Sequence, residues 1–387
     1  MTESRLQTRK RKGENMHYLL SIVIVIAAGT AAQPVQDSGA QFARAVQLQQ
    51  QGKLAEAAAE YRLLLKRAPG HAEAHANLGV VLARMGKYKE AVEAYETAYR
   101  LAPQLTPILL NLGIAYYRAG EFARAAEVLP RFLEKAPGSI QARRLYGLSL
   151  SALGRDEEAI RELSQTLDAE PPDAAAFYEL GMACLRARKP GLQAALKRLA
   201  SFPEGLPALH LLQGQAFLRD KEFEQAIEEL ELARRDNPDL PRVHYALGMA
   251  YLQMNRNEEA RKAFLEEERR TPRDYATRYS LAVIYEAAAE LATARRYVNA
   301  ALQLEPQSIE GNALLSKILM KQGREAEALA PLARAVARDP KDPVKRYTLA
   351  RLYRQLGRTA DANREFAEVQ RLKAAQLQED RAKTPKP

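Results

Sequence analysis

A regularly repeated stretch is the feature that most limits what this chain can fold into. The segment NLGVVLARMGKYKEAVEAYETAYRLAP (77–103) returns as NLGIAYYRAGEFARAAEVLPRFLEKAP (111–137), with the same Asn-Leu-Gly at the front and Ala-Pro at the end. The pattern continues in both directions and gives ten repeats, which begin at residues 38, 72, 106, 140, 174, 207, 241, 275, 309 and 343. A fixed period of this kind is typical of small structural units that stack on one another.

Three positions of the repeat explain how each unit would fold. Position 8 is small in all ten repeats, position 20 is Ala in nine, and position 32 is Pro in eight. Apolar residues recur at helical spacing, as in Leu78, Val81 and Leu82. Small residues let two helices approach closely, Gly86 permits a turn, and a Pro ends the second helix because it lacks a donor. Each repeat is therefore predicted to be a helix–turn–helix hairpin, and stacking buries its apolar face.

This pattern resembles the tetratricopeptide repeat family. In the second repeat, His75 replaces the signature Trp, and the other signature positions hold Leu78, Gly79, Gly86, Tyr88, Ala91, Tyr95, Ala98 and Pro103. The resemblance implies an all-α fold, a right-handed superhelical solenoid of about ten helix–turn–helix repeats over residues 38–376. It implies little about biochemical function, because such repeats serve many unrelated partners.

The array is interrupted at its fifth repeat. We expect repeats 1–4 at 38–173, an irregular repeat 5 at 174–206, repeats 6–10 at 207–376 and a polar tail at 377–387. In repeat 5 the segment 187–191 replaces the usual turn, and we expect a short second helix around 192–200 before a Phe-Pro pair. A hinge and a tolerated deletion both remain open interpretations.

Residues 1–32 are predicted to be a signal peptide or a membrane anchor, followed by a linker at 33–37. A basic segment precedes an apolar run, Leu19–Ala32, that ends in small residues. A transmembrane helix needs about 20 apolar residues, so the run is short for a span. Cleaved signal, uncleaved anchor and neither remain open. The first two place the repeats outside the cytoplasm, exported, periplasmic or secreted, or held at the membrane by residues 19–32.

Charge and motifs exclude several classes of function. The net charge of +10 is diffuse, which slightly favours acidic partners or an anionic membrane surface and does not indicate nucleic-acid binding. No phosphate loop, catalytic carboxylate pair or Ser-His-Asp order stands out, so we predict no enzyme, cofactor or metal site. His71 and His75 are four residues apart, but His75, His210 and His244 all occupy position 4, which favours packing over metal ligation.

The resemblance also implies where a partner would bind. In such arrays the first helices line a concave surface, mainly through positions 2, 5, 6, 9, 12 and 13. Aromatic and Arg side chains often carry interface energy, and the Asn amides could grip a peptide backbone. The alternatives are packing between helices and an ordinary solvated face. The predicted groove residues are Phe42, Asn77, Arg84, Asn111, Tyr117, Arg118, Tyr178, Arg186, Arg219, Tyr245, Tyr279 and Tyr347.

The sequence thus predicts a non-enzymatic protein–protein interaction scaffold, exported or associated with the cell envelope. Its partner would be a protein or peptide segment, and the Arg side chains favour an acidic one. Two alternatives keep the repeats. One is a membrane-anchored assembly factor, and the other is a non-catalytic subunit of an envelope or polysaccharide-processing complex.

Overall fold

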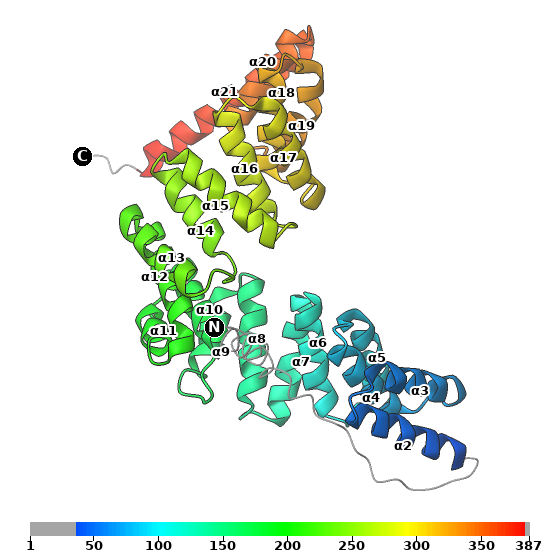
Figure 1. Cartoon of the computed structure of the whole chain (residues 1–387). Helices are drawn as coiled ribbons and strands as arrows, with labels where there is room; N and C mark the ends of the chain where they lie inside the picture. The colour runs from blue at the N-terminus through cyan, green and yellow to red at the C-terminus, as the bar shows by residue number, and fades with distance from the viewer. Residues whose placement is uncertain (1–35, 384–387) are drawn as a thin grey trace, which may run out of the picture. The chain divides into compact units, whose positions relative to one another are not determined.

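The computed structural model describes residues 36–383, and within them the chain is built from α-helices with one short 3-10 helix and no strand (Figure 1). The predicted all-α fold is confirmed. The helices pair into ten hairpins: α2 (Gln36–Gln50) with α3 (Leu54–Arg67), α4 (Ala72–Arg84) with α5 (Tyr88–Leu101), α6 (Pro107–Ala119) with α7 (Phe122–Lys135), α8 (Ile140–Ala152) with α9 (Asp156–Ser164), α10 (Ala174–Ala187) with α11 (Leu192–Leu199), α12 (Leu206–Asp220) with α13 (Phe223–Asp236), α14 (Val243–Gln253) with α15 (Asn257–Arg270), α16 (Tyr275–Ala287) with α17 (Leu291–Leu304), α18 (Ile309–Lys321) with α19 (Glu325–Arg338), and α20 (Pro343–Gln355) with α21 (Thr359–Lys383).

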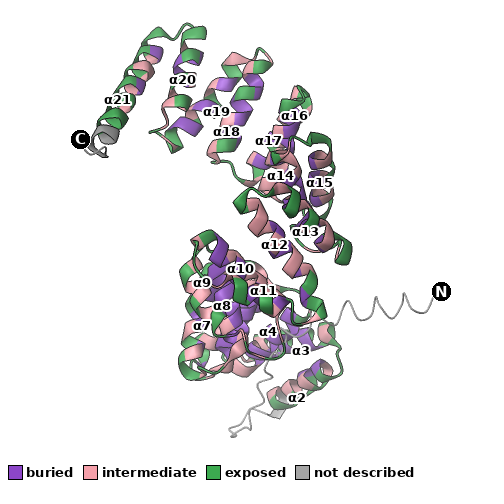
Figure 2. Cartoon of the chain, turned by 90° about the vertical axis from the view of Figure 1, so that its left-hand side faces the viewer, coloured by how far each residue is buried: buried purple, intermediate pink, exposed green. Residues whose placement is uncertain are grey.

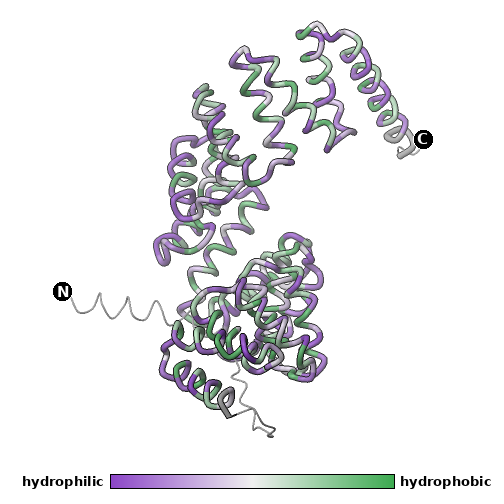
Figure 3. Tube along the Cα trace, turned by 90° about the vertical axis from the view of Figure 1, so that its right-hand side faces the viewer, coloured by the Kyte–Doolittle hydropathy of each residue, from purple (hydrophilic) through white to green (hydrophobic). Residues whose placement is uncertain are grey.

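The chain forms two compact units, which divide after Leu212 within α12. In the first unit, each first helix contacts the first helix of the next repeat, from α2 through α4, α6 and α8 to α10. In the second unit, α16 contacts α18 in the same way. The helices alternate apolar and polar stretches (Figure 3), and buried residues lie where paired helices face each other (Figure 2).

The small residues at positions 8 and 20 permit close packing within a hairpin, as predicted. A Cβ added to Gly79 would lie 2.6 Å from a ring carbon of Tyr95, and one added to Gly248 would lie 2.7 Å from a ring carbon of Phe264. The alanines at position 20 are almost fully buried in every hairpin that has one. A larger side chain at either position would push the two helices apart.

The turn inside each hairpin needs a residue in the left-handed region. All ten turn residues have a positive φ, but only six are Gly. The turns of repeats 5–8 use Arg188, Lys221, Asn255 and Ala289 instead. A side chain in this conformation costs about 1–2 kcal/mol for most residues and less for Asn. Seven of the eight second helices that precede a position-32 proline end two residues before it, as α5 does before Pro103, whereas α9 ends earlier, at Ser164.

Repeat 5 departs from the others in the way the sequence indicates. Its second helix, α11, has only eight residues and is followed by a 3-10 turn, η1 (Pro203–Gly205). In other repeats a large side chain of the second helix covers the position-8 glycine. Here Leu212 of α12 covers Gly181 instead. A Cβ added to Gly181 would lie 2.3 Å from a methyl carbon of Leu212. Near the other end, α21 runs past residue 377, where the polar tail is predicted to begin.

The predicted signal peptide or anchor, residues 1–32, lies outside the described residues. Of the predicted linker at 33–37, only residues 36 and 37 are described, and they begin α2. None of the helices within residues 36–383 is both long enough and apolar enough to cross a membrane.

Candidate functional site

The histidines at position 4 join neighbouring repeats. The Nε2 atom of His75 lies 2.9 Å from the carbonyl oxygen of Pro69, and that of His244 lies 3.2 Å from the carbonyl of Pro238. Since a carbonyl only accepts, the imidazole donates in both bonds. Three other position-4 side chains donate to the corresponding proline carbonyl before them: Arg143, Asn312 and Arg346. Within the described residues no cluster of three His, Cys, Asp or Glu could hold a metal ion.

Three of the predicted groove aromatics pack against the second helix of their own hairpin. Each meets, edge to face, the ring at position 24 of the same repeat. The pairs are Phe42–Tyr61, Tyr245–Phe264 and Tyr347–Phe366, with ring centroids 6.0, 5.6 and 5.7 Å apart. This contact stabilises the hairpin and fixes the ring, since such pairs prefer this geometry. Tyr347 nevertheless keeps 46% of its surface exposed.

The other three predicted tyrosines are partly buried. Tyr117 meets Phe122 edge to face at 5.5 Å, and Tyr279 stacks on Tyr275 at 5.8 Å. Burial raises the pKa of both Tyr117 and Tyr279. Tyr178 lies on α10. These rings present only part of their surface, so their role in binding stays a prediction.

Two of the predicted arginines at position 13, Arg84 and Arg186, bond to the preceding repeat. Arg84 donates from Nη1 to the carbonyl oxygen of Gln49 at 3.3 Å. Arg186 donates from Nη2 to the Ser151 hydroxyl at 2.9 Å and forms a 2.7 Å ion pair with Asp156. Both bonded partners, Gln49 and Ser151, belong to the repeat before. Internal bonds therefore occupy part of the predicted Arg row.

The remaining two arginines of the row differ from each other. Arg219 forms hydrogen bonds with its chain neighbour Asp220, at 2.7 and 2.9 Å. Arg118 has no carboxylate within ion-pair distance among the described residues. Arg118 is thus the better candidate of the two for an external anion.

The two predicted asparagines are buried. Asn77 has no exposed surface and Asn111 has 2%. Neither amide atom of Asn77 has a hydrogen-bond partner within the described part of the chain. A buried polar group without a partner costs about 1–3 kcal/mol. The structure places the two residues on successive first helices, α4 and α6, which contact each other.

The most accessible part of the predicted surface lies on α20. Val344 and Tyr347 are 71% and 46% exposed, and Arg351, also exposed, follows on the same helical face. They occupy positions 2, 5 and 9, three of the groove positions. Sequence reasoning selected Tyr347 alone, although the register would also have indicated Val344 and Arg351.

A buried carboxylate holds two lysines on the neighbouring first helix. Glu286 of α16 is 6% exposed at its side chain, and its oxygens lie 2.9 Å from Lys317 Nζ and 2.6 Å from Lys321 Nζ. Burial alone would raise the pKa of Glu286, but the hydrogen bonds from Lys321 and Lys317 hold it below its ordinary value. The lysine side chains are 58% and 49% exposed, so one buried negative charge orients two accessible positive ones.

Comparison with protein families decides the class of the chain. Two family models described as tetratricopeptide repeat match it, one at 42–106, 147–205, 245–309 and 294–343, the other at 82–147 and 217–266. The chain belongs to the tetratricopeptide repeat family. No curated protein matches it. Members of this family bind proteins or peptides, so the coarse class of function is protein interaction.

A solved structure shows the same fold, and two others share a more limited similarity. The Cut9–Hcn1 hetero-tetramer of the APC/C matches with a TM-score of 0.51 and 15% identity, over 87% of this chain and 81% of that one. A MamA double mutant matches with a TM-score of 0.42 and 19% identity, over 44% of this chain and 96% of that one. A second MamA structure matches with a TM-score of 0.41 and 14% identity, over 43% and 96%. At 15% identity the likeness to the Cut9–Hcn1 structure concerns the fold alone.

Proposed function

We propose that this chain is a non-catalytic scaffold that binds an acidic partner segment along the first helices of its last three repeats. The observation that carries the proposal is the exposed face of α20. There Val344, Tyr347 and Arg351 are all exposed and follow one another along one face of the helix. Apolar side chains next to Arg are the combination found at energetically important interface positions.

The charges on the first helices α18 and α20 favour an acidic partner. Lys317 and Lys321 are held in place by Glu286, so they lose less side-chain freedom when an anion binds. Arg351 has no carboxylate within ion-pair distance among the described residues, and its planar fork suits a carboxylate. The rigid ring of Tyr347 supplies contact area at low entropic cost. An acidic segment with an apolar side chain would satisfy all of these groups.

A quantitative capture experiment tests this proposal. The full chain and the double variant Tyr347→Ser/Arg351→Gln serve as baits in a solubilised envelope extract, and bound proteins are quantified by mass spectrometry. A control bait carries Leu377→Ser/Arg371→Gln, which removes an exposed apolar side chain and a guanidinium from the second helix α21. We expect partners retained by the wild type and the control to be lost by the first variant. Equal recovery by all three baits would contradict the proposal.

Export of the chain is a separate part of the proposal. It rests on the basic segment and the apolar run Leu19–Ala32, which is the pattern of a signal peptide. Fractionation followed by N-terminal sequencing tests it. A mature N-terminus near residue 33 in a periplasmic or secreted fraction supports export, and an intact N-terminus in the membrane fraction supports the anchored alternative. An intact chain confined to the cytoplasm would contradict both.

A further inference from the structure

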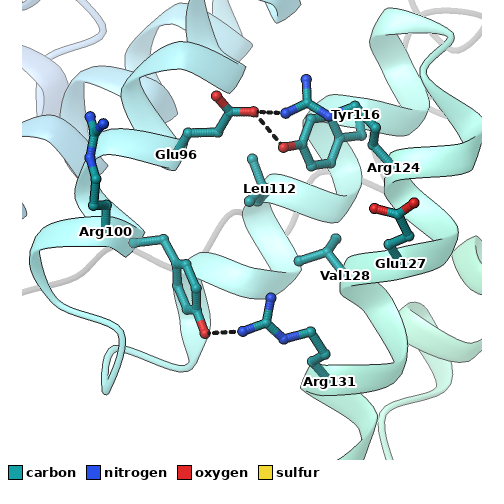
Figure 4. A pocket seen from close by; sticks show the side chains of 9 residues that line it. Glu96, Arg100, Leu112, Tyr116, Arg124, Glu127, Val128 and Arg131 are labelled. Atoms are coloured by element: carbon teal, nitrogen blue, oxygen red, sulfur yellow. Dashed lines mark hydrogen bonds and ion pairs between the residues drawn. The ribbon is translucent and has the colours of Figure 1, made fainter.

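A second candidate binding site lies on the second-helix side of repeats 2 and 3, apart from the predicted groove. It is a pocket of about 270 Å³ formed by α5, α6 and α7 (Figure 4). The pocket is smaller than the sites of most cofactors and drug-sized ligands, which begin at about 300 Å³, and suits one side chain with its flanking groups. The lining residues are Glu96, Tyr99, Arg100, Leu112, Tyr116, Arg124, Glu127, Val128 and Arg131.

The centre of this pocket is apolar. Leu112 and Val128 lie between the charged side chains in Figure 4 and are 4% and 6% exposed. Their buried methyl groups would contact the tip of an entering side chain and exclude water from it. An aliphatic side chain of a partner fits this part of the pocket best.

On one wall of the pocket, the polar side chains bond to one another. Tyr116 donates its hydroxyl hydrogen to Glu96 Oε1 at 2.6 Å, and Arg124 forms an ion pair with the same carboxylate. The guanidinium of Arg124 also lies over the Tyr116 ring, 4.4 Å from its centroid. These three groups brace the repeats against each other and leave no net charge for a ligand.

The opposite wall carries two guanidinium groups, those of Arg100 and Arg131, that form no ion pair among the described residues, although the Glu127 carboxylate also lines the pocket. Arg131 donates from Nη2 to the Tyr99 hydroxyl at 2.6 Å, and Arg100 donates to the Thr97 hydroxyl at 3.2 Å. Neither guanidinium has an acidic partner within ion-pair distance among the described residues. Tyr99 accepts from Arg131, so the hydroxyl hydrogen of Tyr99 remains available to donate. Guanidinium and hydroxyl donors together suit a carboxylate.

We propose that this pocket binds an acidic peptide segment of a partner protein, with one aliphatic side chain on Leu112 and Val128 and a carboxylate on Arg131. The Glu127 carboxylate lies on the lining and repels such a segment, so it weakens the binding. The site is independent of the face of α20, and its partner could be the same protein or a different one.

Fluorescence anisotropy with a defined probe tests this proposal. The probe is a labelled peptide in which a central leucine is flanked on each side by a pair of acidic residues, and it is titrated with the full chain. Comparison peptides replace the leucine by alanine, or all of the acidic residues by their amides. The chain variants are Arg131→Gln, Glu127→Gln and the control Arg371→Gln, each made in the Tyr347→Ser/Arg351→Gln background so that the probe reports on the pocket and not on the face of α20.

We expect Arg131→Gln to weaken binding of the leucine probe about tenfold, as the loss of a charged hydrogen bond does. Glu127→Gln should tighten binding, Arg371→Gln should leave it unchanged because Arg371 pairs with Glu368 on α21, and both comparison peptides should bind more weakly. Thermal melting confirms that each variant folds. The proposal is overturned if no saturable binding occurs or if Arg131→Gln has no effect. Complete loss of probe binding in the Tyr347→Ser/Arg351→Gln background also overturns it and leaves the scaffold proposal intact, because the probe then binds at α20 alone.

Discussion

Two places in this molecule share one framework and differ in charge. They are the α5–α7 pocket of repeats 2 and 3 and the α13–α15 seam, which occupies the equivalent positions of repeats 6 and 7. In the pocket, Tyr116 bonds to Glu96, and Arg124 lies over its ring. In the seam, Tyr251 bonds to Glu231 at 3.0 Å, and Arg256 lies 4.6 Å from the centroid of its ring.

Two residues beside this framework have opposite charges in the two places, whereas Arg100 and its equivalent Arg235 are both basic. Glu266 stands where the pocket has Arg131, and Lys262 stands where it has Glu127. Glu266 is balanced by Arg269 and Arg270 of its own helix, with Arg270 Nη2 at 2.8 Å. Arg131 instead bonds to a neutral tyrosine. The comparison teaches that the packing of one repeat on the next requires the tyrosine–glutamate pair in both places. The charged residues at the positions of Arg131 and Glu127 can differ without loss of that pair, so they can serve binding instead.

The largest expected effect comes from replacing the position-8 glycine of each of the two hairpins by alanine. An alanine Cβ would lie 2.5 Å from Leu129 in Gly113→Ala and 2.7 Å from the Phe264 ring in Gly248→Ala. We expect both to lower the free energy of unfolding by about 1–3 kcal/mol, with the larger loss at Gly248 because a planar ring yields less than a leucine. Urea unfolding measures this. Gly138→Ala is the control, since its added Cβ meets no atom within 4 Å, and equal stability of all three variants would refute the packing argument.

The second prediction transfers the charges of the seam to the pocket. The double variant Arg131→Glu/Glu127→Lys should weaken binding of the acidic leucine probe by at least tenfold, which is about 1.4 kcal/mol. The helix content should not change, because exposed charges contribute little to stability. Anisotropy and circular dichroism check the two statements. Unchanged affinity would show that the charge difference between the two places has no binding role.

A third, smaller effect distinguishes the turns of the same two hairpins. Gly120 and Asn255 occupy equivalent positions with φ of 79° and 57°. We expect Gly120→Ala to cost about 1 kcal/mol, and Asn255→Gly to stabilise by about 0.5 kcal/mol or less, because Asn tolerates this region. Denaturant titration of both variants provides the measurement. A stabilising Gly120→Ala would contradict the assigned left-handed turn.

The smallest expected effect is a pH dependence that only one of the two hairpins has. Burial lowers the pKa of His244, and the hydrogen bond to Pro238 only partly offsets this. The unfolded chain therefore binds a proton more readily, so the contribution of His244 to stability is present above about pH 6.5 and is lost as the pH falls through its lowered pKa. Leu109 is the equivalent residue in the other hairpin. Melting temperatures between pH 5 and 8 should show a shallower pH slope in His244→Leu, and an unchanged slope would contradict the assignment.

The fold was predictable because its signals are local. A small residue at position 8, Ala at position 20 and Pro at position 32 each act within one hairpin, and the structure confirms the close approach at Gly79 and the end of α5 before Pro103. The turns of repeats 5–8 were harder, because Lys221 and Ala289 do not signal a left-handed conformation. There the surrounding hairpin imposes the conformation.

The candidate sites were less predictable because they depend on contacts between repeats. Whether Arg186 is available depends on Asp156 and Ser151 of the preceding repeat, and the orientation of Lys321 depends on a buried Glu286. Resemblance selected positions and could not tell which side chains the neighbouring repeat engages. The α5–α7 pocket was missed because the family pattern directs attention to the first helices, whereas most of its lining comes from second helices.

Hydrogen–deuterium exchange of the full chain, with and without a captured partner, tests the central claim most directly. The account predicts slower exchange in α18 and α20, residues 309–321 and 343–355, with the protection lost in Tyr347→Ser/Arg351→Gln. Protection confined to second helices, or unchanged exchange in α18 and α20 at saturating partner, would contradict binding along the first helices of the last repeats.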